Sequence, residues 1–109
     1  MSSYLIQVAY SVQALATLIK NPQNRTEVVR KSVEKLGGKL VGIWFAFGDY
    51  DVMVIVELPD NVSAAALALA VAGSGTGKSV KTTPLLSVEE GVAALKKAGT
   101  SGYKPVGAK

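Results

Sequence analysis

The fold of this chain is decided by the stretch Val41-Gly-Ile-Trp-Phe-Ala-Phe-Gly-Asp-Tyr-Asp-Val-Met-Val-Ile-Val-Glu-Leu58. Two runs of strand-forming residues flank Gly48-Asp49-Tyr50, which has the composition of a tight turn. Successive side chains of a strand point to opposite faces of the sheet, so a strand with one exposed face alternates apolar and polar residues. Both runs are largely apolar on both faces. We therefore expect a β-hairpin that is covered on both sides.

The two-residue period assigns the hairpin side chains to faces. In the first strand, one face carries Val41, Ile43, Phe45 and Phe47, and the other carries Leu40, Gly42, Trp44 and Ala46. In the second strand, one face carries Val52, Val54, Val56 and Leu58, and the other carries Met53, Ile55 and Glu57. Helices of the same small domain can cover one face, whereas the second face needs a partner sheet. A second copy of the chain is the simplest source, so we expect a homodimer or a multiple of dimers.

The composition is that of one globular domain and excludes several kinds of chemistry. The chain has 109 residues, of which 49% are hydrophobic and 18% are charged. It contains neither cysteine nor histidine, so disulfides, thiolate chemistry, the commonest metal ligand and the commonest general base are all absent. There is no Asp-rich loop that would hold a hard cation. We expect no metal and no cofactor.

The charge pattern and the apolar runs argue against nucleic-acid and membrane partners. The net charge is +4, and the basic residues are scattered over helix ends instead of forming a stripe with interleaved aromatics. The first seven residues lack the basic region and long apolar run of a signal peptide. The longest apolar run, residues 64–72, is far shorter than the roughly 20 residues of a bilayer span. These features predict a cytoplasmic protein.

The remaining pattern alternates strands and helices. It predicts strands over 4–10 and 78–83, and helices over 12–19, 25–36, 63–73 and 87–98. Ser11 caps the first helix, Gly37-Gly38 ends the second, and Ser87 with Glu90 forms a capping box. A βαββαβ order most simply forms a four-stranded antiparallel sheet with helices on one face, the ferredoxin-like α+β arrangement, here with a C-terminal helix. We expect one domain over residues 1–98 and a flexible tail over 99–109.

Apolar stripes at helical spacing predict how the helices pack. The stripes are Val12, Leu15, Ala16 and Ile19 in the first helix, Val29, Val33 and Leu36 in the second, and Val88, Val92 and Leu95, facing inward, in the last. The helix over 63–73 is apolar all round, so we expect it to be buried on more than one side. Glu27 and Lys31 form a favourable i,i+4 pair.

Several short motifs occur in a familiar order. They are Tyr4-Leu-Ile-Gln7, Leu36-Gly-Gly-Lys39, Phe45-Ala-Phe-Gly-Asp-Tyr-Asp51, Leu58-Pro-Asp-Asn61 and Lys81-Thr-Thr-Pro-Leu-Leu86. Together they resemble the GYD domain family of small bacterial proteins over roughly residues 4–95, with Gly48, Tyr50 and Asp51 at its signature. The resemblance implies the dimeric α/β barrel group, which includes haem-handling enzymes, oxygenases, isomerases and ligand-sensing domains of regulators. It implies no particular activity, and many of those enzymes use histidine.

The candidate ligand residues gather around the hairpin. Gly48, Tyr50 and Asp51 have the chemistry of a turn, and the alternative is that Tyr50 and Asp51 point into a pocket. Trp44, Phe45, Phe47 and Met53 are interpreted as plain core or, alternatively, as the lining of an apolar cavity between sheet and helices. Candidates for polar groups at the mouth of that cavity are Tyr4, Tyr10, Gln7 and Glu57, unless Glu57 pairs with Lys81 across the sheet.

A glycine-rich segment, Ala72-Gly-Ser-Gly-Thr-Gly-Lys-Ser79, resembles a P-loop with alanine in place of the first glycine. A P-loop needs a preceding strand and a following helix, so that the helix N-terminus faces the phosphates. The predicted order here is helix, loop, strand. A flexible glycine loop is therefore the favoured interpretation, and nucleotide binding ranks last among the functions considered.

Two functions remain. The first is a non-enzymatic, homo-oligomeric α/β barrel that binds a small, partly apolar molecule. The alternative is a cofactor-independent isomerase or oxygenase-like enzyme for a small organic acid or aromatic, with Tyr50 or Asp51 as acid or base and Arg25 or Arg30 holding an anion. The missing histidine and cysteine favour the first.

Overall fold

The computed structural model describes residues 1–107 and confirms the predicted order of elements. The elements are β1 (Ser2–Tyr10), α1 (Val12–Lys20), α2 (Thr26–Lys35), β2 (Lys39–Phe45), β3 (Val52–Leu58), α3 (Asn61–Gly73), β4 (Gly77–Leu85) and α4 (Val88–Gly99). The predicted tail over 99–109 begins at the end of α4, and its last two residues lie outside the described part of the chain. No helix within residues 1–107 combines the length and the apolar character that a membrane crossing requires.

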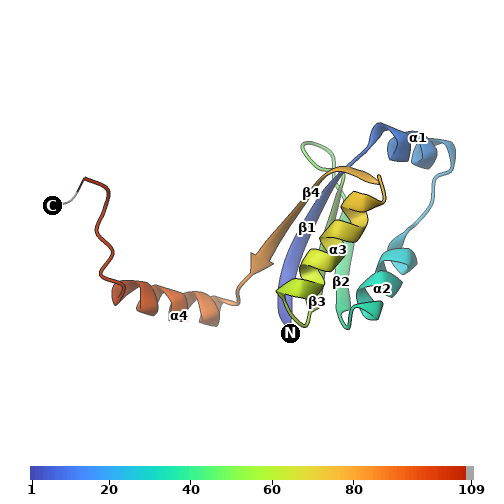
Figure 1. The fold of residues 1–109 in the computed structure, drawn as a ribbon. Helices are drawn as coiled ribbons and strands as arrows, with labels where there is room; N and C mark the ends of the chain where they lie inside the picture. The colour runs from blue at the N-terminus through green and yellow to red at the C-terminus, as the bar shows by residue number, and fades with distance from the viewer. Residues whose placement is uncertain (108–109) are drawn as a thin grey trace.

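The sheet has the strand order β2-β3-β1-β4, and every neighbouring pair is antiparallel. This confirms the predicted ferredoxin-like arrangement. The helices α2 and α3 lie over one face of the sheet, and α1 sits beyond the end of β1 (Figure 1). None of these helices covers the opposite face. We call it the uncovered face; its strand residues include Leu5, Gln7, Met53, Ile55, Glu57, Lys81 and Leu85.

The core lies between the sheet and its helices, and strand periodicity predicts it correctly along β1 and β3. The buried residues of these strands on the helix side are Tyr4, Ile6, Val8, Tyr10, Val52, Val54, Val56 and Leu58. From the helices, Val33 and Leu67 complete this core and are 0% and 6% exposed. The alternation follows directly from the pleat, because residues two apart share a face.

The face assignment in β2 is corrected by a bulge. Leu40 is the register partner of Val56 and Gly42 of Ile55, so Val41 is an extra residue between them. A bulge of this kind reverses the alternation on one side of the insertion. Leu40 therefore shares the helix side with Ile43 and is buried, and the prediction that it shares a face with Trp44 is wrong.

The strand ends also differ from the prediction. β2 ends at Phe45 and β3 begins at Val52, so the connection is longer than a tight turn. It is closed by a hydrogen bond of 2.8 Å from the Ala46 amide to the Asp51 carbonyl oxygen. β4 runs over Gly77–Leu85, longer than the predicted 78–83, because pairing with the central strand β1 carries it past Pro84. As expected, β4 lies at an edge of the sheet.

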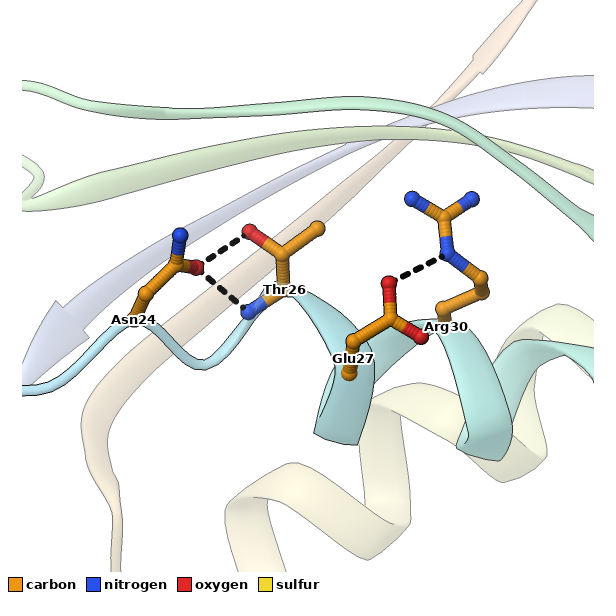
Figure 2. Close-up of polar contacts among 4 residues, drawn as sticks. All are labelled: Asn24, Thr26, Glu27 and Arg30. Atoms are coloured by element: carbon orange, nitrogen blue, oxygen red, sulfur yellow. Dashed lines mark hydrogen bonds and ion pairs between the residues drawn. The ribbon is translucent and has the colours of Figure 1, made fainter.

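The start of α2 depends on Asn24, and its ion pair differs from the expected one (Figure 2). The Asn24 Oδ1 accepts from the Thr26 amide at 3.0 Å and from the Thr26 hydroxyl at 2.6 Å. Glu27 pairs with Arg30 at 3.1 Å, and the predicted pair with Lys31 does not form. Residues three apart are also neighbours on a helix surface, and the guanidinium offers more donors than an ammonium.

The predicted packing of α1 and α3 is corrected in part. Ser11 caps α1 as expected, but Ala14 and Leu18 face the core, while Val12 and Ile19 are 78% and 77% exposed. Because α1 lies beyond the strand end, the direction of the chain at Ser11 decides which side meets the core. The helix α3 is buried on one side only, through Ala64 and Leu67. Its far side packs against no other element of residues 1–107.

The inward packing predicted for the last helix is wrong for the single chain. The capping box of Ser87 and Glu90 is present, and it lowers the pKa of Glu90 because the carboxylate accepts from the Ser87 amide. However, α4 extends away from the sheet and its helices (Figure 1). The residues predicted to face inward, Val88, Val92 and Leu95, are 84%, 44% and 73% exposed.

Gly38 is required by close packing between α2 and β2. A Cβ at this position would collide with the carbonyl oxygen of Glu57 and the side chain of Leu58, and would lie 3.2 Å from Val33 Cγ1. We expect Gly38→Ala to lower the free energy of unfolding by about 1–3 kcal/mol, as overpacking does. The matched control is Gly73→Ala, where a Cβ meets nothing within 4 Å. Urea unfolding measures both, and equal stability of the two variants would contradict the packing argument.

Candidate functional site

A cleft opens between the edge of the sheet and the α1–α2 connection. Its volume is about 530 Å³. The strands β1, β2 and β3 form one wall, and residues 22–26 form the other. The lining residues are Tyr10, Leu18, Pro22, Gln23, Asn24, Arg25, Thr26, Ile43, Trp44, Phe45 and Val52.

Two further hollows adjoin this cleft at the same pair of residues. One, of about 440 Å³, runs between α2 and α3 over the sheet and is mainly apolar. The other, of about 290 Å³, lies between α1 and the loop at residues 74–76. Tyr10 and Arg25 line all three. We call this region the Tyr10–Arg25 cleft.

Tyr10 brings a hydroxyl group into an otherwise apolar wall. It is the last residue of β1, lies on the helix side of the sheet and is 9% exposed. None of the hydrogen bonds among residues 1–107 uses its hydroxyl group. Burial raises the pKa of the phenol, the Arg25 guanidinium opposes this, and the Asp51 carboxylate adds to it. The phenol is therefore protonated at neutral pH and can donate a hydrogen bond to a ligand.

Arg25 supplies a positive charge at the same place. It precedes the first residue of α2, held there by the Asn24 contacts to Thr26 (Figure 2). Among the described residues the only ion pair is that of Arg30 with Glu27, so no carboxylate neutralises Arg25. A guanidinium beside a hydroxyl donor and apolar walls suits an anionic group attached to an apolar body.

The structure distributes the predicted aromatic residues over different surroundings. Trp44 and Phe45 line the cleft, and the Trp44 ring also lies close over Gly42, where a Cβ would collide with it. Phe47 is fully exposed at the hairpin connection. Met53 is the register partner of Trp44 and Gln7 and belongs to the uncovered face. These four residues do not share one cavity.

The signature residues lie at the end of the sheet, outside the lining of the cleft. Gly48 has φ 144°, a value that favours glycine. The Asp51 Oδ2 accepts from the Tyr10 amide at 2.7 Å, and the Asp51 amide donates to the Val8 carbonyl at 2.9 Å. The Asp51 carboxylate thus binds the end of β1 and not the amides of its own turn. Tyr50 is half-buried and lines none of the three hollows.

Of the residues predicted at the mouth of a cavity, only Tyr10 lines one. Tyr4 is 2% exposed, and its hydroxyl donates to Asn61 Oδ1 at 2.7 Å. Gln7 and Glu57 lie on the uncovered face. The alternative pairing of Glu57 with Lys81 is excluded, because β1 separates their strands and Lys81 is the register partner of Gln7.

The glycine loop has the order that argues against a P-loop. The helix α3 ends at Gly73 and the strand β4 begins at Gly77, so a helix precedes the loop and a strand follows it. No helix N-terminus faces the loop glycines from the position that a P-loop requires. Ser74, Gly75 and Thr76 instead close one side of the Tyr10–Arg25 cleft. Among residues 1–107 there is no cluster of three or more metal-ligating acidic side chains.

The sequence interpretation missed most of the wall opposite the sheet. Leu18, Pro22 and Gln23 come from α1 and from the connection to α2, and Ile43 and Val52 come from the strands that face it. The break at Asn21-Pro22 is visible in the sequence as a helix end. That this connection turns over the edge of the sheet depends on where α1 and α2 dock.

The comparisons with known proteins agree with this fold. A search of curated proteins finds no significant match. A model of the GYD domain family matches residues 4–95, which include β1 from Tyr4 onward, the other three strands, α1 to α3 and α4 as far as Leu95. The matched segment covers well over half of the 109 residues. The chain belongs to the GYD domain family.

Proposed function

We propose that this chain is a homodimeric α/β barrel that binds a small, partly apolar organic acid in the Tyr10–Arg25 cleft. The observation that carries the proposal is that three adjoining hollows meet at the free hydroxyl of a largely buried tyrosine and at an arginine that forms no ion pair among residues 1–107. From the family we further propose that the protein is bacterial, and from the sequence features that it is cytoplasmic.

The ligand class follows from the donors and the walls of the cleft. The volume of about 530 Å³ is within the range of small-molecule sites. Ile43, Val52 and Phe45 supply apolar surface for the body of a ligand. The Arg25 guanidinium and the Tyr10 hydroxyl are two hydrogen-bond donor groups, and neither carries a negative charge. This favours a carboxylate or a similar anion over a neutral polar group.

The dimer part of the proposal rests on the uncovered face. Leu5, Met53 and Ile55 lie side by side on β1 and β3, on the face opposite α2 and α3. Ile55 is only half-exposed, because neighbouring strands already shield it. The apolar face of an antiparallel sheet stabilises the fold only when another layer covers it. A second sheet can do so by packing face to face at a distance of about 10 Å. A second copy provides a matching surface by two-fold symmetry.

The geometry favours binding over the enzymatic alternative with Tyr50 or Asp51 as acid or base. The Asp51 carboxylate is occupied by the Tyr10 amide, and neither Asp51 nor Tyr50 lines the cleft. Arg30, the other arginine considered for an anion, is paired with Glu27 and also lies outside the lining. Arg25 is therefore the residue we assign to the anion.

The test uses two fluorescent probes of similar shape and different charge. The anionic probe is 8-anilinonaphthalene-1-sulfonate, and the neutral probe is N-phenyl-1-naphthylamine. We expect Arg25→Gln to weaken binding of the anionic probe about tenfold, because one charge-assisted interaction is lost, and to change binding of the neutral probe little. Fluorescence titration of the folded dimer gives both dissociation constants.

The matched control is Arg30→Gln, which removes the same charge from the same helix outside the cleft. It should leave both probes unaffected. Equal weakening by Arg25→Gln and Arg30→Gln would show a non-specific charge effect and overturn the assignment. Binding of neither probe by the parent protein would overturn the cleft as a ligand site.

A further inference from the structure

The helix α4 packs against no other element of residues 1–107, and none of its residues is buried. It begins with a complete capping box at Ser87 and Glu90 and ends with Lys96 and Lys97 in its last turn. It extends away from the sheet (Figure 1), and the principal extents of the chain are 60 × 33 × 21 Å. The radius of gyration is 17.5 Å, whereas a compact domain of this length has about 13 Å.

A helix of this length is only marginally stable in water without packing. Isolated helices shorter than about 12–15 residues are marginal even when they are alanine-rich. α4 has 12 residues and contains Gly91 in its interior, which costs about 1 kcal/mol relative to alanine. Among residues 1–107, a Cβ at Gly91 would meet no atom within 4 Å. No close contact in this part of the chain therefore requires a glycine at this position. Contact with another molecule would supply the missing stabilisation.

The apolar surface of α4 continues that of the uncovered face. Leu85, the last residue of β4, is the register partner of Ser3 and lies on that face. Leu86 follows and is 64% exposed, and the stripe of Val88, Val92 and Leu95 comes next. Only Leu86 and Ser87 separate the strand from the helix. A molecule that packs on the uncovered face at Leu85 is therefore the nearest surface for this stripe.

We propose that residues 86–99 form an arm, and that the helix α4 within this arm packs on a second copy of this chain. Two copies exchange their arms in this way. The inference rests on the proposed dimer and goes beyond it, because it assigns a second interface that sheet packing does not require. In a two-fold symmetric pair each arm packs on the other chain, so the stripe is buried twice. The exchange joins the two copies through α4, a helix that would otherwise be only marginally stable.

Hydrogen exchange followed by peptide mass spectrometry tests the arm on the full chain, with sedimentation velocity reporting the oligomeric state. At concentrations where the protein is dimeric, we expect the α4 amides to exchange at least about tenfold more slowly than in a free peptide. Dilution below the dissociation constant should remove this protection. Both changes should occur over the same concentration range.

Two substitutions of the same kind locate the stripe. Leu95→Lys places a charge in the stripe, whereas Ala94→Lys places the same charge outside it, about 100° further round α4, and lysine is a good helix former at both positions. We expect Leu95→Lys to remove the protection of α4 and weaken the dimer about tenfold or more. Ala94→Lys should leave both unchanged.

The possible failures are distinguishable. A dimer whose α4 amides exchange freely would overturn the arm and leave the sheet-face dimer intact. Protection that is independent of concentration would mean that α4 folds back on its own chain, which also overturns the exchange. Equal effects of the two lysine substitutions would remove the role of the stripe. A monomer at all concentrations would overturn the proposed dimer and the arm together.

Discussion

Ile55→Lys is expected to convert the proposed dimer into folded monomers, with the dissociation constant raised about 100-fold or more. Ile55 lies near the middle of the uncovered face, between Leu5 on β1 and Gly42 on β2. Two-fold symmetry would bring a lysine from each copy into the same desolvated layer, where unpaired charges are costly. In the monomer, the lysine ammonium can remain in water. Sedimentation velocity over a concentration series measures the change, and far-UV circular dichroism checks the fold.

The control for this variant is Leu69→Lys. Leu69 is 71% exposed on α3, on the side of the sheet away from the uncovered face. It should leave the dissociation constant unchanged. If Ile55→Lys dimerised as tightly as the parent, the sheet face would not be the interface, and a different surface would have to join the copies.

Asp51→Ala is expected to lower the free energy of unfolding by about 1.5–3 kcal/mol, the range for a hydrogen bond to a charged group. The Asp51 Oδ2 accepts from the Tyr10 amide at 2.7 Å, at the point where the register between β1 and β4 shifts. Removing the carboxylate leaves this amide without that acceptor in a partly buried place. Urea unfolding with a constant m-value gives the difference in stability.

Two further substitutions, Asp49→Ala and Asp51→Asn, serve as comparisons. Asp49→Ala removes a carboxylate from the exposed part of the same connection and should change stability by less than about 0.5 kcal/mol. Asp51→Asn keeps an oxygen acceptor without the charge and should fall between the alanine variant and the parent. Asp51→Ala as stable as Asp49→Ala would leave the signature aspartate without a structural role.

The Asp51 contact links the family signature to the proposed ligand site. Asp51 holds the backbone of Tyr10, and the Tyr10 side chain lines the cleft together with Arg25. The carboxylate also contributes to the raised pKa of the Tyr10 phenol and so helps to keep it protonated. Loss of Asp51 should therefore affect ligand binding indirectly, through the position and the protonation of Tyr10.

The sequence by itself determined the elements and the topology, because both depend on local periods. The two-residue alternation in β1 and β3 places their core residues correctly, and Ser11, Gly37 and the Ser87–Glu90 capping box mark helix ends as predicted. Short connections between strands and helices then leave the ferredoxin-like order as the simplest arrangement. These features need no knowledge of distant contacts.

The tertiary structure alone decided three features that depend on pairing between distant segments. The bulge at Val41 arises because β2 must match β3, and no local period reveals an inserted residue. The Tyr10–Arg25 cleft forms because the α1–α2 connection lies beside one end of strands β1, β2 and β3, which brings together residues far apart in the chain. The helical spacing of Val88, Val92 and Leu95 identifies an apolar side of α4. The spacing does not indicate what this side packs against. In the structure this side of α4 is exposed, because the chain leaves the sheet at the end of β4 and α4 extends away from it.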